Sequence, residues 1–167
     1  MLSFKNILFV LNIKDQNSID SLKSIIEEGF NEGISINIYD SSILNKDNAE
    51  IDGIKVIKQS EISESDLIIS IGGDGTMLKS AKLSYKYDIP VTGINKGRLG
   101  FLTDINPSDA NQAIKNLLSG KFFTEERLLI NTTINNDHSS TSVALNDVAI
   151  RRSETGRMMK VVTSIDG

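Results

Sequence analysis

The sequence predicts a doubly wound α/β fold with a mostly parallel sheet, followed by the beginning of an all-β part. Continuous apolar runs at residues 7–11 and 67–71 are typical of strands that are buried on both faces of a parallel sheet. Segments with apolar residues at helical spacing alternate with these runs, which is the order expected of β-α-β units. After residue 121 the pattern changes to strand-like segments separated by turn residues.

The first half of the α/β part alternates strands with one helix. Apolar residues from Ile19 to Ile26 recur at helical spacing, and Ser18 is a possible cap in front of them. In chain order, the predicted segments are a strand at 7–11, a helix that ends at Gly29 or Gly33, a strand at 34–38, a polar loop at 41–53 and a short strand at 54–57.

The second half repeats this alternation. Pro107 is well placed in the first turn of a helix, with Asn106 before it as the cap. In chain order, the predicted segments are a strand at 67–71, a helix that reaches about Tyr87, a strand at 90–94 and a helix that Gly120 closes. We therefore predict a Rossmann-like α/β nucleotide-binding domain over residues 1–121.

The remaining residues, 122–167, are expected to be the start of a β-rich domain. The predicted segments are strands at 128–134, 143–145, 148–150 and 158–165, with a turn at 135–137 that makes a hairpin. A lone pair of strands is marginally stable in water, and the chain stops at Gly167 without a closing element. We therefore expect this domain to be incomplete and the sequence to be a fragment.

Composition excludes several classes of protein. Apolar residues make up 39% of the chain and charged residues 24%, which suits a soluble globular domain. The formal charge is -4 without a basic stripe, so nucleic acid is not an expected partner. Cysteine is absent, and no apolar stretch is long enough to span a bilayer. We expect a cytoplasmic protein that does not bind membranes.

The glycine-rich segment at residues 72–76, Gly-Gly-Asp-Gly-Thr, links a buried strand to a helix. Ligands bind at the carboxyl edge of open parallel sheets, and a helix N-terminus favours phosphate. Asp74 is unusual there, because a carboxylate repels an anion; it is therefore a candidate base or metal contact. The alternative is an ordinary turn in which Asp74 caps the helix. The Walker pattern is absent, which excludes a P-loop NTPase.

Residues 72–76 resemble the signature turn that NAD kinases share with diacylglycerol and sphingosine kinases and with phosphofructokinases. Two later segments select among these families. Residues 93–103, Gly-Ile-Asn-Lys-Gly-Arg-Leu-Gly-Phe-Leu-Thr, look like the second block of NAD kinases, and residues 144–148, Ala-Leu-Asn-Asp-Val, look like their third. The chain is thus identified by resemblance as the N-terminal part of a bacterial-type, ATP-dependent NAD kinase.

The resemblance implies a transferase that phosphorylates the adenosine 2′-hydroxyl of NAD with ATP, giving NADP and ADP. Asp74 would accept the hydroxyl proton, and Gly75 would contact the dinucleotide through its backbone. Lys79 could pair with a phosphate, Asn146 and Asp147 match the pair that holds the NAD ribose and nicotinamide side, and Arg157 matches a basic position. In the second block Asn95 and Thr103 could touch the nucleotide, and Phe101 could line the adenine or belong to the core.

The family also implies a divalent cation, with Mg²⁺ expected, and a homo-oligomer when the protein is full length. Mg²⁺ commonly rides on substrate phosphates, so a missing ligand cluster does not argue against it. Because the family continues past residue 167 with a strand-rich domain, we expect this chain alone to have little activity. The alternatives are a non-catalytic nucleotide-binding module and a lipid or sugar kinase that shares the turn.

Overall fold

The computed structural model describes residues 4–30, 33–40, 50–96, 100–103, 105–134, 137–151 and 158–166, with the backbone alone at 137–140. The chain divides into two compact units, Met1–Glu126 and Arg127–Gly167. Each unit has a secondary structure of its own and is described by itself. None of the described helices is both long and apolar enough to cross a membrane.

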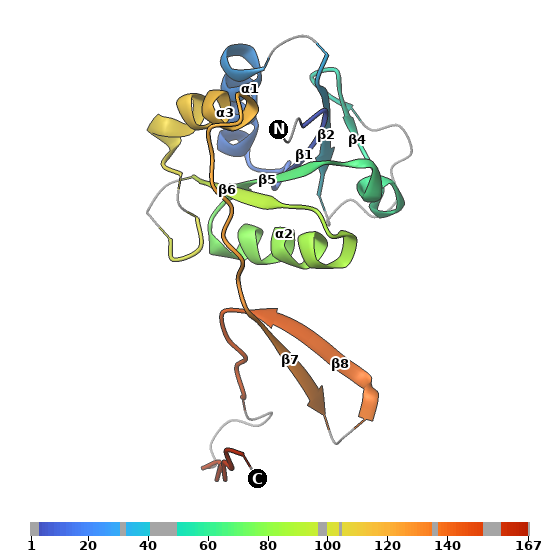
Figure 1. The fold of residues 1–167 in the computed structure, drawn as a ribbon, viewed down its shortest axis with the longest axis vertical. Coiled ribbons are helices and arrows are strands. Elements are labelled where there is room, and N and C mark those ends of the chain that lie inside the picture. The colour runs from blue at the N-terminus through green and yellow to red at the C-terminus, as the bar shows by residue number, and fades with distance from the viewer. Residues whose placement is uncertain are drawn as a thin grey trace. The chain divides into compact units, whose positions relative to one another are not determined.

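The first unit is built on a six-stranded sheet with the order β3-β4-β2-β1-β5-β6 (Figure 1). Neighbouring strands run parallel, apart from the antiparallel pair of β3 and β4 at one edge. The strands are β1 (Asn6–Val10), β2 (Ser35–Tyr39), β3 (Glu50–Ile51), β4 (Ile54–Val56), β5 (Leu67–Gly72) and β6 (Val91–Asn95). The helices are α1 (Gln16–Gly29), α2 (Asp74–Tyr87) and α3 (Ala110–Leu118), with 3-10 turns η1 (Gln59–Glu64) and η2 (Pro107–Asp109).

Helices cover both faces of this sheet, which confirms the predicted doubly wound α/β class. Figure 1 shows α1 and α3 on one face and α2 on the other. Alternate side chains of β1 and β5 enter two separate cores: Phe9 and Ile69 lie on the side of α1 and α3, while Leu8 and Ile68 lie on the side of α2. All six residues of β5 are buried, as expected of a central strand in a parallel sheet.

Some local predictions are wrong. The residue before α1 in the cap position is Asp15, whereas Ser18 is buried inside the helix and its hydroxyl donates to the Asp15 carboxylate at 2.5 Å. The segment predicted as a loop at 41–53 contains the strand β3; its residues 41–49 lie outside the described part. The turn η1 was not predicted, and it is held by Glu61, whose carboxylate accepts the amide of Lys58 at 2.8 Å.

The second unit is an antiparallel hairpin of β7 (Leu129–Ile134) and β8 (Asp137–Leu145), which confirms the predicted hairpin. The Thr132 hydroxyl ties the strands together by donating to the carbonyl of Ser142 at 2.9 Å. The strands predicted at 148–150 and 158–165 are wrong, because the structure has no strand in either segment. A strand needs a neighbour for its backbone groups, and the apolar residues of these segments are exposed.

Candidate active site

The carboxyl edge of the sheet has a switch point between β1 and β5. From β1 the chain passes through α1 to β2, on one side, and from β5 it passes through α2 to β6, on the other. The two helices therefore leave the same edge toward opposite faces of the sheet. In open α/β sheets ligands bind in the crevice that such a divergence creates. The glycine-rich turn leaves β5 at this point.

Backbone close approach shapes the turn between β5 and α2. A Cβ on Gly72 would lie 2.4 Å from Thr76 Oγ1, so only glycine fits without moving the turn. Gly73 occupies the cap position of α2, and its carbonyl accepts the amides of Thr76 and Met77. Asp74 is the first helical residue and lies in the positive end of the helix.

The carboxylate of Asp74 is held by the backbone of a distant segment. Its Oδ2 accepts the amide of Phe101 at 3.2 Å, and its Oδ1 accepts the amide of Leu102 at 3.1 Å. The reading of Asp74 as a cap of its own helix is therefore wrong. Each carboxylate oxygen has a second lone pair, so the side chain can still accept a proton from a ligand hydroxyl.

The segment that reaches Asp74 belongs to a loop whose two ends meet beside β6. The amide of Asn95 donates to the carbonyl of Ile105 at 2.8 Å, and Ile105 forms a parallel bridge with Ile94. Thr103 is buried close to Gly93, where a Cβ would lie 2.8 Å from Thr103 Cγ2. Among the described residues of the second sequence block, Phe101 and Leu102 thus bring their backbone amides to the carboxylate.

The three residues of this block that are candidate nucleotide contacts differ in their exposure to solvent. Phe101 is 93% exposed, so the alternative that it belongs to the core is wrong. Asn95 and Thr103 are buried, at 2% and 1% exposure. The Thr103 hydroxyl has no hydrogen-bond partner within the described residues.

The structure groups the remaining predicted site residues in two places. Gly75 and Lys79 lie on α2, one and five positions after Asp74; both are exposed, and a Cβ on Gly75 would meet nothing within 4 Å. Asn146 and Asp147 follow β8 in the second unit, where the Asn146 amide donates to Asp147 Oδ1 at 3.2 Å. Asn146 has a φ of 79°, a left-handed conformation that asparagine tolerates. Arg157 lies outside the described residues.

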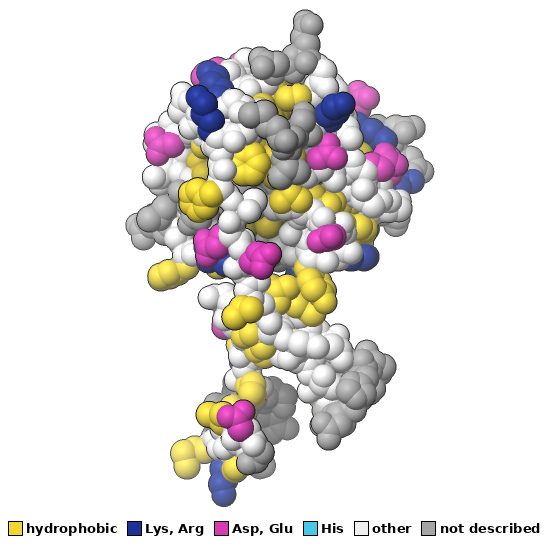
Figure 2. Space-filling model, in the orientation of Figure 1, with side chains coloured by type: hydrophobic (Ala, Val, Ile, Leu, Met, Phe, Trp, Pro, Cys, Tyr) yellow, Lys and Arg dark blue, Asp and Glu magenta, His cyan; other side chains and the backbone are white. Residues whose placement is uncertain are grey.

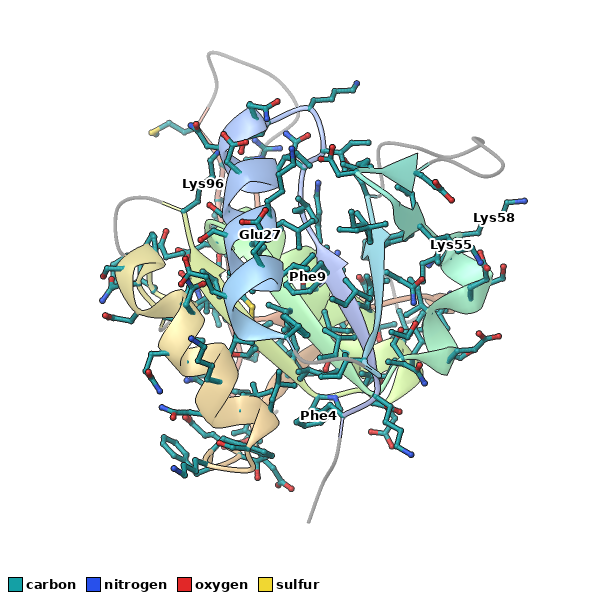
Figure 3. The ribbon with its side chains drawn as sticks, turned by 90° about the horizontal axis from the view of Figure 1, so that it is seen from above. Phe4, Phe9, Glu27, Lys55, Lys58 and Lys96 are labelled. Atoms are coloured by element: carbon teal, nitrogen blue, oxygen red, sulfur yellow. The ribbon has the colours of Figure 1, made fainter. Side chains whose placement is uncertain are left out.

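Sequence reasoning missed an ion pair at this edge. Lys96, directly after β6 (Figure 3), pairs with the carboxylate of Asp15, which directly precedes α1. The sequence could have indicated Asp15 as a helix cap, because aspartate is common in that position. No pattern in the sequence connects Asp15 with Lys96. The neighbouring strand end adds a further buried carboxylate, since Asp40 Oδ2 accepts the amide of Ile13 at 2.9 Å.

Charge on the first unit is mixed, and metal ligands are sparse. Acidic and basic side chains are interspersed on the face seen in Figure 2. Burial, with smaller contributions from Tyr87 and Asp40, raises the pKa of the Tyr39 hydroxyl at the carboxyl edge. Among the described residues, no three His, Cys, Asp or Glu side chains are grouped to hold a metal ion.

Substituting Gly100→Ala is expected to displace the Asp74 carboxylate, because a Cβ there would lie 2.2 Å from its Oδ1. We expect the amide resonances of Phe101 and Leu102 to shift, and any phosphotransfer that uses Asp74 to slow by about ten- to a hundredfold. Gly73→Ala is the control for the resonances, since a Cβ at Gly73 meets nothing. Unchanged Phe101 and Leu102 amides in Gly100→Ala would contradict the contact.

The fold and the glycine-rich turn at the carboxyl edge of the sheet define the class of this protein. It is a doubly wound α/β protein with the turn at the switch point, and proteins of this class bind nucleotides there. The family model described as ATP-NAD kinase N-terminal domain matches residues 8–122. The chain therefore belongs to the NAD kinase family.

Curated relatives agree with this assignment. The chain is 40% identical to the NAD kinase of Teredinibacter turnerae over 116 residues, which cover 68% of this chain and 40% of that protein. It is 32% identical to the NAD kinase of Laribacter hongkongensis over 166 residues, covering 98% of this chain and 56% of that protein. The chain thus spans about half or less of the length of these relatives.

A solved structure supports the fold. The crystal structure of yeast NADH kinase complexed with NADH superimposes with a TM-score of 0.65, covering 86% of this chain and 47% of the yeast chain. At 16% sequence identity this likeness concerns the fold alone.

Proposed function

We propose that the protein phosphorylates NAD at the 2′-hydroxyl of its adenosine ribose, with ATP as the donor, and so makes NADP and ADP. The observation that carries this proposal is the Asp74 carboxylate, held by two backbone amides at the switch point of the sheet. It lies within the residues that match the ATP-NAD kinase N-terminal domain.

In the proposed reaction Asp74 takes the proton of the 2′-hydroxyl. The ribose oxygen then forms a bond to the γ-phosphorus of ATP, and the bond from that phosphorus to the bridging oxygen breaks, releasing ADP. Phosphoryl transfer depends mainly on positioning and charge stabilisation. The amides of Phe101 and Leu102 supply positioning for the base, because each of them fixes one carboxylate oxygen.

The substrate contacts are proposals of the same kind. The open backbone at Gly75 allows close approach of a dinucleotide, and the exposed ammonium of Lys79 suits a phosphate. Asn146, Asp147 and Arg157 are proposed to hold the ribose, nicotinamide side and pyrophosphate of NAD. The hairpin of the second unit would then begin the β-rich NAD-binding domain, with the α/β domain ending near residue 121.

A divalent cation is expected to accompany the reaction as Mg²⁺ bound to ATP, where it neutralises phosphate charge. We propose that this cation arrives with its nucleotide, because Mg²⁺ is commonly held by substrate phosphates with few protein ligands. We further propose a cytoplasmic homo-oligomer that acts on small-molecule nucleotides and binds neither nucleic acid nor membrane.

The function is tested with a chimera, in which this chain continues into the part of the Laribacter hongkongensis kinase that lies beyond the matched residues. We expect NADP to form from NAD and ATP, and we expect diacylglycerol, sphingosine and fructose 6-phosphate to remain unchanged. Phosphorylation of one of these alternatives without NADP formation would overturn the proposal. The 167-residue chain is assayed alongside the chimera.

A further inference from the structure

We propose that Asp15 and Lys96 are positioning residues, which hold the loop that presents two backbone amides to the Asp74 carboxylate. This inference rests on the proposed function in one respect, namely that Asp74 is the base. The pair itself is visible in the structure, because Lys96 Nζ contacts Asp15 Oδ2.

The ion pair crosses the carboxyl end of β5. Asp15 precedes α1 in the loop after β1, and Lys96 follows β6. In the sheet, β5 lies between β1 and β6. The ion pair therefore spans the end of the strand from which the glycine turn and Asp74 emerge, and Figure 3 shows Lys96 beside α1.

The carboxylate of Asp15 is not used as an ordinary cap. A cap aspartate normally accepts a backbone amide of the first helical turn, yet Asp15 makes no such side-chain bond. Its Oδ2 accepts instead from the Ser18 hydroxyl, which is buried, and from Lys96. The helix thus orients a carboxylate toward Lys96 and leaves its own amides without that bond, which points to a role outside α1.

The segment after β6 is held at three places among its described residues. Its ends are joined by the hydrogen bond from the Asn95 amide to the Ile105 carbonyl. Lys96 is tied to Asp15, and the amides of Phe101 and Leu102 are tied to Asp74. Ordering one backbone residue costs about 1–2 kcal/mol. When one set of contacts is lost, the remaining contacts must offset this cost alone and are therefore formed for less of the time. Breaking the pair should therefore loosen the grip on Asp74.

The side chains of this pair are partly buried. The side chains of Lys96 and Asp15 are 30% and 23% exposed. A second ion pair joins Lys23 of α1 to Asp52 in the turn between β3 and β4, and its side chains are more exposed, at 41% and 52%. Lys23→Met is thus a matched control, because it makes the same substitution in an ion pair that does not reach the loop.

The test compares Asp15→Asn, Lys96→Met, the double variant and Lys96→Arg with Lys23→Met. In the 167-residue chain we expect both single variants to shift the amide resonances of Phe101 and Leu102 and to speed their hydrogen exchange. In the chimera we expect each to lower kcat by about ten- to a hundredfold with little change in KM. The double variant should be no worse than either single one, Lys96→Arg should restore most of kcat, and Lys23→Met should leave it unchanged.

Two results would overturn the proposal. If the Phe101 and Leu102 amides do not respond to Asp15→Asn, the pair does not hold the loop. If Lys96→Met raises the KM for ATP while Asp15→Asn lowers it, Lys96 is a phosphate ligand that Asp15 restrains. Failure of the proposed function is a separate outcome, since a chimera that makes no NADP still permits the amide measurement on the chain.

Discussion

Asp74→Asn is expected to lower kcat for NAD phosphorylation by about a hundred- to ten-thousandfold, the range of a positioned base. An asparagine has nearly the same shape but cannot take the 2′-hydroxyl proton. One of its two terminal atoms also becomes a donor, which would face the amide of Phe101 or Leu102 in place of an acceptor. The measurement is steady-state kinetics on the chimera, combined with calorimetric binding of NAD.

The matched control for this variant is Asp66→Asn. Asp66 also accepts two backbone amides through its carboxylate, those of Lys5 and Asn6 at 2.8 and 2.9 Å, but it precedes β5 and therefore lies at the opposite edge of the sheet. We expect this control to cost some stability and to leave kcat near that of the parent. If Asp74→Asn kept its rate while NAD still bound, the assignment of Asp74 as the base would be wrong.

The parts of the fold that the sequence predicts best are those in which burial acts on contiguous residues. The runs at 7–11 and 67–71 became β1 and β5, since a strand buried on both faces must be apolar at successive positions. The strand β3 has two residues and pairs with β4 at the edge of the described sheet, and two residues are too few to show a periodic pattern. The tail segments at 148–150 and 158–165 have strand-like composition, but composition cannot supply a pairing partner.

The candidate site likewise has one part that contiguous residues reveal and another part that depends on residues far apart in the sequence. Gly72 and Asp74 are legible because strand, turn and helix follow one another directly in the chain. The contacts that orient Asp74 come from backbone amides, which every residue except proline possesses, so no side-chain pattern announces them. Asp15 and Lys96 stand 81 positions apart, and only the order of strands in the sheet brings them together.

Phe9→Ala is expected to lower the free energy of unfolding of the first unit by about 3–5 kcal/mol. Phe9 is fully buried, lies opposite Ile69 of β5 in the sheet and packs edge-on against Phe30 with ring centroids 5.9 Å apart. Truncation removes this apolar surface from the core and leaves a cavity between the sheet and α1. Urea denaturation measures the effect, and tyrosine fluorescence reports it, because all three tyrosines, Tyr39, Tyr85 and Tyr87, lie in the first unit.

The control for this loss is the same substitution on the surface of the same unit. Phe123 is 90% exposed, so Phe123→Ala should change the free energy of unfolding by no more than about 0.5 kcal/mol. Equal losses in the two variants would mean that the first unit does not use Phe9 as a core residue. A large loss of unfolding free energy in Phe9→Ala alone would show that the packing between β1, β5 and α1 stabilises the unit. Asp15 directly precedes α1 and Asp74 closely follows β5, so this packing also supports the candidate site.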